Sequence, residues 1–162
     1  SEIIDNFQNI YEIKWLNMMR DKLGLFGEDK DDLELINNLL NWMQSNQVDY
    51  TNTFCYLMNI SSIQDQIYKN KDFINWSKIW EKRILINGGT KQNSLELMKN
   101  NNPIIIPRNH KVEEVLEAAN NNDLNPMNIL LSILKKPYEN QSNIENFQVP
   151  SNNENYQTFC GT

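Results

Sequence analysis

Apolar residues recur at intervals of three and four positions through most of this chain, and this spacing limits what the chain can fold into. Side chains three and four positions apart lie on one face of an α-helix. The clearest stretch has the apolar residues Phe73, Trp76, Trp80 and Ile84 at this spacing, with charged residues such as Lys78, Glu81 and Lys82 elsewhere on the helix. No segment alternates apolar and polar residues over enough positions to indicate a β-sheet. The sequence therefore predicts an all-α fold, an irregular multi-helix domain.

The predicted helices begin after polar capping residues or at a proline, and they end near asparagine, glycine or proline. Asp49 opens the capping residues of the third helix, Asn109 is expected to cap the sixth, and Pro126 suits the first turn of the last. A break at Ser61 and Ser62 precedes a short helical turn. The helices are expected over about 4–24, 33–45, 50–59, 73–87, 94–99, 110–119 and 126–136.

Two segments depart from the helical pattern. Pro103 and Pro107 bracket three isoleucines, and each proline disfavours the helical region for the residue before it, so this segment is expected to be extended. From Glu139 onward the periodicity is lost. We therefore divide the chain into a helical domain, 1–138, and a polar tail, 139–162, that ends in a cysteine.

Composition and charge exclude several classes of protein. The chain has 15 basic and 21 acidic residues, a net charge of −6, and its basic residues are scattered, which argues against nucleic-acid phosphates as the main partner. No apolar run approaches the roughly 20 residues that cross a bilayer, so a soluble cytoplasmic protein without a membrane partner is expected. Because the helical pattern begins almost at Ser1, we expect the chain to be part of a longer protein.

The chain lacks the groups that nucleotidyl transfer requires. Such chemistry needs a glycine loop for phosphates, a lysine, a metal-binding acid and a base. The glycines at 24, 27, 88 and 89 do not fit that spacing and are interpreted as caps and turns. The acidic run before Leu33 lacks the oxygen ligand that a calcium loop places there. No catalytic, cofactor-binding or metal-binding residue is predicted in this chain.

Four residues remain as candidates for a functional or partner contact. Arg108, Asn109 and His110 follow the extended segment, where the Arg108 guanidinium can either brace the fold or grip a ligand carboxylate. His110 is the only histidine, so no histidine cluster can form. Cys160 lies near the terminus, where a thiol has access and mobility, and it is either a redox residue or an inert terminal thiol. Cys55, within an apolar helix, is interpreted as a small buried hydrophobe.

Five motifs stand in order along the chain, at residues 22–25 (KLGL), 49–54 (DYTNTF), 102–110 with 112–113, 137–138, and 156–162. As an ordered set they resemble the C-terminal region of the selenoprotein O-like family. Members of that family are kinase-fold enzymes that transfer AMP from ATP to proteins. The resemblance implies that this chain packs on a kinase-like core upstream of Ser1, and that ATP, Mg²⁺ and the protein substrates bind to that core.

The resemblance assigns one residue of this chain a family role. Cys160 matches the terminal cysteine or selenocysteine of the family, which implies redox control, for example through a disulfide to the catalytic part. Cys55 stands where a basic residue is expected in relatives. Our leading hypothesis is a helical domain that supports or regulates an absent nucleotidyltransferase core. The alternatives are an independent helical protein-interaction module, or a thiol redox module acting through Cys160.

Overall fold

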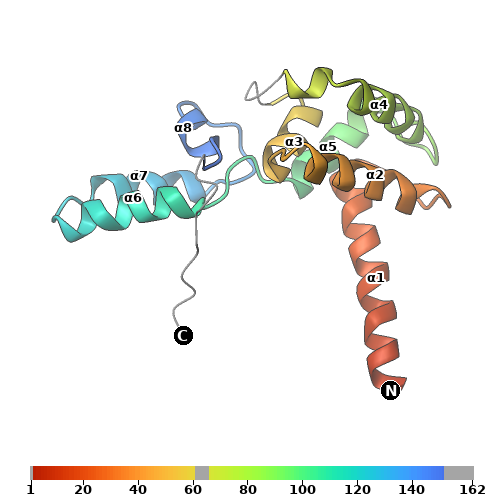
Figure 1. The fold of residues 1–162 in the computed structure, drawn as a ribbon, viewed down its shortest axis with the longest axis horizontal. Coiled ribbons are helices and arrows are strands. Elements are labelled where there is room, and N and C mark those ends of the chain that lie inside the picture. The colour runs from red at the N-terminus through yellow and green to blue at the C-terminus, as the bar shows by residue number, and fades with distance from the viewer. Residues whose placement is uncertain (1, 61–65, 152–162) are drawn as a thin grey trace. The chain divides into compact units, whose positions relative to one another are not determined.

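The computed structural model of the chain describes residues 2–60 and 66–151, with side chains from Phe7 onward. Every regular element in these ranges is helical, which confirms the predicted all-α fold (Figure 1). The helices fall into two compact units, Ser1–Asn102 and Pro103–Thr162. No helix among the described residues has both the length and the apolar content that a membrane crossing requires.

The described residues of the first unit form five α-helices and a short 3₁₀ turn, η1. α2 packs against α4, and α1 packs against α5. The predicted helices are all present, and α5 is longer than predicted because Thr90 and Asn93 form a capping box that begins it earlier. The elements are α1 (Glu2–Lys22), α2 (Asp32–Ser45), α3 (Tyr50–Leu57), η1 (Ile67–Lys69), α4 (Lys71–Arg83) and α5 (Lys91–Asn101).

Aromatic residues of α2, η1 and α4 form much of the core of this unit. Trp76 and Trp80 stack with ring centroids 5.9 Å apart, and both rings are buried. Their indole N–H groups donate to backbone carbonyls, Trp76 to Leu35 at 2.9 Å and Trp80 to Leu23 at 2.8 Å. Because an indole N–H needs a partner when it is buried, these two bonds fix how α4 faces α2 and the end of α1.

The apolar stripe predicted for the first helix forms, but most of it is uncovered. Phe7 and Tyr11 are 71% and 60% exposed, and α1 becomes buried only from Met19. In Figure 1 the N-terminal half of α1 lies clear of the other helices of its unit. An amphipathic pattern predicts which face of a helix is apolar, whereas burial of that face depends on a partner.

The second unit is a helical hairpin with an additional short helix. α6 (Asn109–Asn120) and α7 (Asn125–Leu134) pack against each other, and α8 is Glu145–Gln148. The segment between Pro103 and Pro107 is non-helical, as predicted, and Ile104 is buried there. Its backbone N–H donates to the Pro137 carbonyl at 2.7 Å, so this segment lies beside the end of α7.

Two details of this unit differ from the predictions. Asn109 does not cap α6: it is the first helical residue, and the preceding Arg108 takes the cap position with an extended backbone and no side-chain cap bond. The stretch after Glu139, expected to be tail, contains α8. The Gln148 side chain there donates to the Ile104 carbonyl at 3.1 Å. A helix of four residues is too short to show a hydrophobic period, so the pattern could not predict it.

Gly24, directly after α1, provides a test of the local packing. Its φ is +69°, and an added Cβ would lie 2.6 Å from the Ser94 carbonyl oxygen of α5. We expect Gly24→Ala to lower the free energy of unfolding by about 2 kcal/mol or more, from backbone strain and this clash. Urea denaturation measures the loss.

Gly88→Ala is the matched control. Gly88 has a φ of +81° but nothing within 4 Å of an added Cβ, so alanine there should cost only the backbone strain, about 1 kcal/mol. Equal losses for the two variants would show that the contact between Gly24 and α5 contributes nothing.

Candidate functional site

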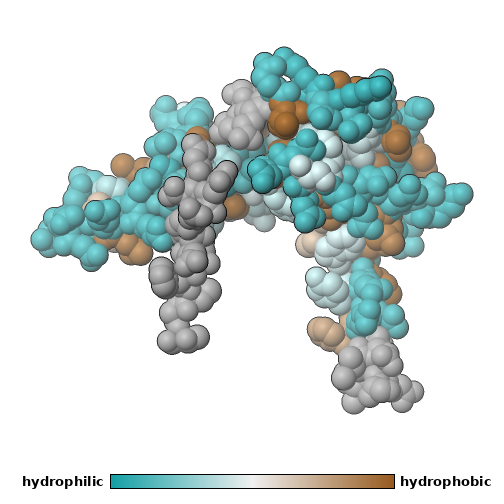
Figure 2. Space-filling model, viewed as in Figure 1, coloured by the Kyte–Doolittle hydropathy of each residue, from teal (hydrophilic) through white to brown (hydrophobic). Residues whose placement is uncertain are grey.

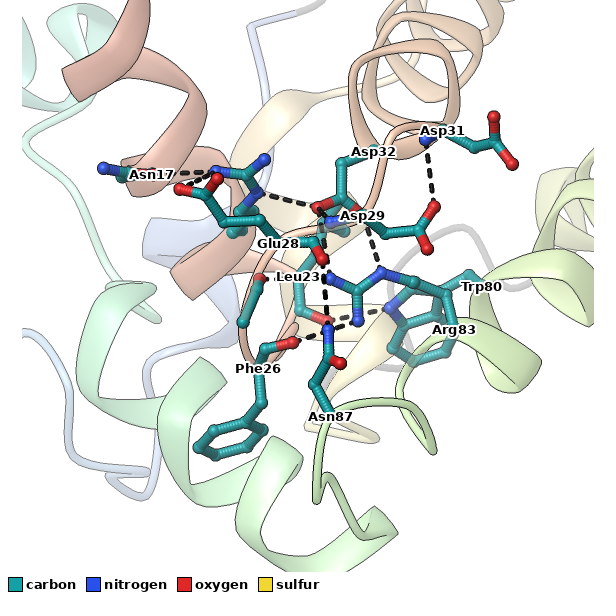
Figure 3. Close-up of polar contacts among 12 residues, drawn as sticks. Asn17, Leu23, Phe26, Glu28, Asp29, Asp31, Asp32, Trp80, Arg83 and Asn87 are labelled. Carbon is teal, nitrogen blue, oxygen red and sulfur yellow. Dashed lines mark hydrogen bonds and ion pairs between the residues drawn. The ribbon is translucent and has the colours of Figure 1, made fainter.

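The strongest concentration of charge inside the first unit surrounds the Asp32 carboxylate, whose side chain is fully buried. Arg20 Nε donates to Oδ2 at 2.7 Å, and Arg83 donates from Nε to Oδ1 at 2.6 Å and from Nη2 to Oδ2 at 3.1 Å. The Asp29 backbone N–H adds a fourth bond at 2.9 Å. Figure 3 shows the Asp32 carboxylate and the Arg83 guanidinium facing each other. Each carboxylate oxygen therefore accepts charge-assisted hydrogen bonds.

These three residues lie at the ends of three helices. Arg20 is in the last turn of α1, Asp32 is the first residue of α2, and Arg83 is the last residue of α4. Arg83 also donates to the carbonyls of Phe26 and Gly27 at 3.1 and 3.2 Å. One carboxylate thus joins three helix ends, and its arginines also hold the irregular loop between α1 and α2.

The electrostatics keep Asp32 ionised. Burial alone would raise the pKa of its carboxyl, but hydrogen bonds from Arg83, Arg20 and the Asp29 backbone outweigh burial, and the pKa lies below its ordinary value. A carboxylate that is ionised, buried and bonded to two guanidinium groups is a poor general base and is poorly suited to binding a further cation. The acidic run at 29–32 therefore contributes a structural anchor, and no group of three or more acidic, histidine or cysteine residues in the described chain could hold a metal.

A second junction surrounds Lys22. Its ammonium lies 4.9 Å from the Phe54 ring centroid and donates to the Asn101 carbonyl at 3.2 Å, while the Asn102 side chain donates to the Lys22 carbonyl at 2.8 Å. Burial lowers the pKa of Lys22. Cys55, beside Phe54, is fully buried, as predicted. One residue from each of three sequence motifs, Lys22, Phe54 and Asn102, therefore lies at this junction of α1, α3 and the end of α5.

The residues predicted as functional lie elsewhere. Arg108, Asn109 and His110 are at the start of α6, where Arg108 and His110 are half-buried and Asn109 is exposed. They belong to the second unit, whereas the Asp32 cluster belongs to the first. Cys160 lies outside the described residues, so its redox role stays a prediction.

Sequence reasoning missed the Arg20–Asp32–Arg83 cluster. The chain has 12 lysines but only three arginines, at 20, 83 and 108. Two of these arginines are buried and the third is half-buried. Arginine is the residue suited to bidentate contacts with carboxylates, so its rarity in a lysine-rich chain was a signal that could have identified these positions.

The model of the family described as protein adenylyltransferase SelO matches residues 1–135. Proteins named protein nucleotidyltransferase YdiU are similar to the chain: that of Pelagibacter ubique (strain HTCC1062) is 52% identical, with 100% of the chain and 34% of the relative covered. Those of Nitrosococcus oceani and Bacillus cereus (strain AH820) are 42% and 43% identical, with 99% and 98% of the chain covered, and 33% of each relative. The chain spans about a third of the length of these relatives.

Asp32→Asn tests whether the cluster holds the unit together. The substitution leaves the buried Arg83 guanidinium without its counter-charge and leaves Arg20 with only the exposed Glu28 carboxylate, 3.4 Å away, so we expect the free energy of unfolding to fall by about 3–5 kcal/mol. The control is Asp31→Asn, because Asp31 is exposed and makes no side-chain cap bond to α2; its loss should be below about 1 kcal/mol. Urea denaturation at neutral pH measures both, and similar losses would contradict a central role for Asp32.

The pH dependence of stability tests the ionisation of Asp32. Because its pKa is lower in the folded chain, Asp32 contributes stability above the unfolded pKa of about 3.9, and this is lost as the pH falls through the folded pKa. The difference in unfolding free energy between the natural chain and Asp32→Asn should therefore be constant above about pH 5 and shrink below about pH 4. A difference that does not change down to pH 2 would contradict the lowered pKa.

Proposed function

The chain belongs to the protein adenylyltransferase SelO family, and on this premise we propose that it is the helical C-terminal part of an enzyme that transfers AMP from ATP to protein hydroxyl groups. In this proposal the chain supports a kinase-like catalytic core upstream of it. ATP, Mg²⁺ and the protein substrate bind to that core. The enzyme works in the cytoplasm, and Cys160 provides redox control of it.

The chemistry of the described residues supports this division of labour. The most buried carboxylate, Asp32, is committed to two arginines, and the half-buried lysine, Lys22, is committed to aromatic rings and a helix end. Groups held in this way maintain helix packing and are unsuited to binding a triphosphate or moving a proton. The catalytic groups are therefore assigned to the other two-thirds of the length of the relatives.

The observation that carries the proposal is the uncovered apolar face of α1, which we call the α1 face. It surrounds a groove of about 340 Å³, and Phe7, Ile10 and Tyr11 on it are 71%, 46% and 60% exposed. A contiguous apolar surface of this kind marks a contact with another protein surface. In a chain that spans a third of its relatives, the rest of the same protein is the partner that we propose. The α1 face is lined by Phe7, Ile10, Tyr11, Lys14, Trp15 and Met18.

The same face would also suit an independent interaction module that docks other proteins. The two functions differ in whether AMP transfer by the complete protein depends on the α1 face. A supporting domain is required for AMP transfer by the complete protein, whereas an independent module is not. Loss of activity after a change on the α1 face therefore separates them.

Ile10→Glu tests the proposal in the full-length protein. Burying a carboxylate in an apolar contact is unfavourable, so this variant should lower both the melting temperature of the full-length protein and its rate of AMP transfer to a protein substrate. The 162-residue chain carrying the same change should keep its helical content, because Ile10 is already exposed in it. Calorimetry, radioactive AMP transfer and circular dichroism measure the three effects.

Ile13→Glu is the matched control. Ile13 is on the same helix and is 61% exposed, but it does not line the α1 face, so the identical substitution should leave the full-length protein unchanged. Equal effects of the two variants would remove the case for docking through the α1 face. AMP transfer by the 162-residue chain alone, or tight binding of ATP with Mg²⁺ to it, would overturn the assignment of catalysis to another part of the protein.

A further inference from the structure

A second groove, of about 370 Å³, runs along the seam between α2 and α4, and we call it the α2–α4 groove. Its floor includes Leu35 and Trp76, both only 6% exposed. Ile79, on α4, and Ile86, in the turn after α4, line the same groove but are 59% and 43% exposed. Figure 2 shows apolar surface among hydrophilic surface over this part of α2 and α4. The groove thus offers apolar contact area that no described residue covers.

Charge on the groove is distributed unevenly. Asp29, Asp31 and Glu34 line its α2 side, and no ion pair joins any of them to a basic side chain of the described chain. On the α4 side, Arg83 is neutralised by Asp32, which leaves Lys82 as the basic group. The groove therefore presents three unpaired carboxylates along one edge and one ammonium along the other.

The helix dipole explains part of this pattern but not all of it. Acidic residues in the first turn of α2 stabilise the positive end of that helix. This effect accounts for carboxylates at Asp31 and Glu34, but it does not require Ile79 on α4 and Ile86 in the following turn to lie exposed at the same groove. The combination of an acidic edge with exposed aliphatic side chains is typical of a surface that binds an amphipathic segment.

We propose that the α2–α4 groove binds an amphipathic helix of a partner protein that carries basic residues along one flank. Ile79, on α4, and Ile86, in the turn that follows α4, are both exposed and offer two aliphatic side chains to the apolar face of an incoming helix. Lysine or arginine side chains on its flank pair with Asp31 and Glu34, which lie three positions apart on the opposite edge. This inference does not depend on the adenylyltransferase proposal.

Two synthetic helical peptides of about 18 residues, roughly 27 Å long, test the proposal. Both carry leucines along one ridge; one has lysines on the flank and the other has glutamates. Titration into the isotope-labelled chain, followed by amide NMR shifts, should show the lysine peptide binding at least about tenfold more tightly, with shifts confined to α2 and α4. Equal affinity for the two peptides, or shifts elsewhere, would overturn the proposal.

Charge exchange gives the sharpest test. The double variant Asp31→Lys with Glu34→Lys should weaken binding of the lysine peptide by about tenfold and strengthen binding of the glutamate peptide. The milder pair, Asp31→Asn with Glu34→Gln, removes the two charges without reversing them, so it should weaken binding by an intermediate amount. This pair keeps the test valid if charge reversal disturbs α2. The control, Glu96→Lys with Glu117→Lys, makes the same change in net charge outside the groove and should have no effect. A loss in the control equal to that in the double variant would show general charge attraction instead.

Ile79→Ser tests the apolar part of the site. It removes the exposed aliphatic side chain while leaving every charge in place, so it should weaken binding of the lysine peptide about tenfold without unfolding the chain. Unchanged binding would overturn the proposed helix. Sedimentation of the natural chain provides the last check. If the chain is a dimer and Ile79→Ser converts it to a monomer, a second copy of the chain occupies the groove. That result would also overturn the proposal.

Discussion

The first unit depends on the way one buried carboxylate is neutralised. A lone carboxylate without contact to water is unfavourable by several kcal/mol, and Asp32 exists as an ion there only because two guanidinium groups and a backbone N–H surround it. The Asp32 carboxylate joins one end each of α1, α2 and α4. The chain between α1 and α2 is an irregular loop without a regular element. The loop between them is fixed through its carbonyls, by Arg83 at Phe26 and Gly27. The Trp80 indole does the same at Leu23. Helix packing and loop conformation in this unit therefore share one electrostatic centre.

The parts that could be predicted from the sequence are those set by local physics. Apolar spacing predicted the helices, because the period of an α-helix is a property of neighbouring residues. The Asp49 cap was predicted for the same reason, and its carboxylate accepts from the Asn52 backbone at 2.8 Å. The predicted Asn109 cap was wrong by one residue. The helix begins at Asn109 itself, so Arg108 takes the cap position. A difference of one residue at a helix end lies within the precision of such patterns.

The candidate site could not be predicted in this way. Arg20 is 12 positions from Asp32, and Arg83 is 51 positions away, so their pairing depends on how three helices pack. The sequence showed the acidic residues of the 29–32 run but not which of them is buried. The motifs at 22–25, 49–54 and 102–110 carry a family resemblance, and the contact of Phe54 and Asn102 with Lys22 depends on how α1, α3 and α5 pack.

The two uncovered apolar surfaces of this unit differ in chemistry, and this difference separates the roles that we propose for them. The α1 face is lined by five large apolar or aromatic residues and a single charged one, Lys14, so it resembles the interior of a domain. The α2–α4 groove mixes aliphatic side chains with unpaired carboxylates, as contacts between proteins that associate reversibly do. A surface with a single charged residue loses little solvation when it is permanently covered, whereas carboxylates are better solvated when they return to water. We therefore assign the α1 face to permanent packing within a larger protein and the α2–α4 groove to a partner that binds and leaves.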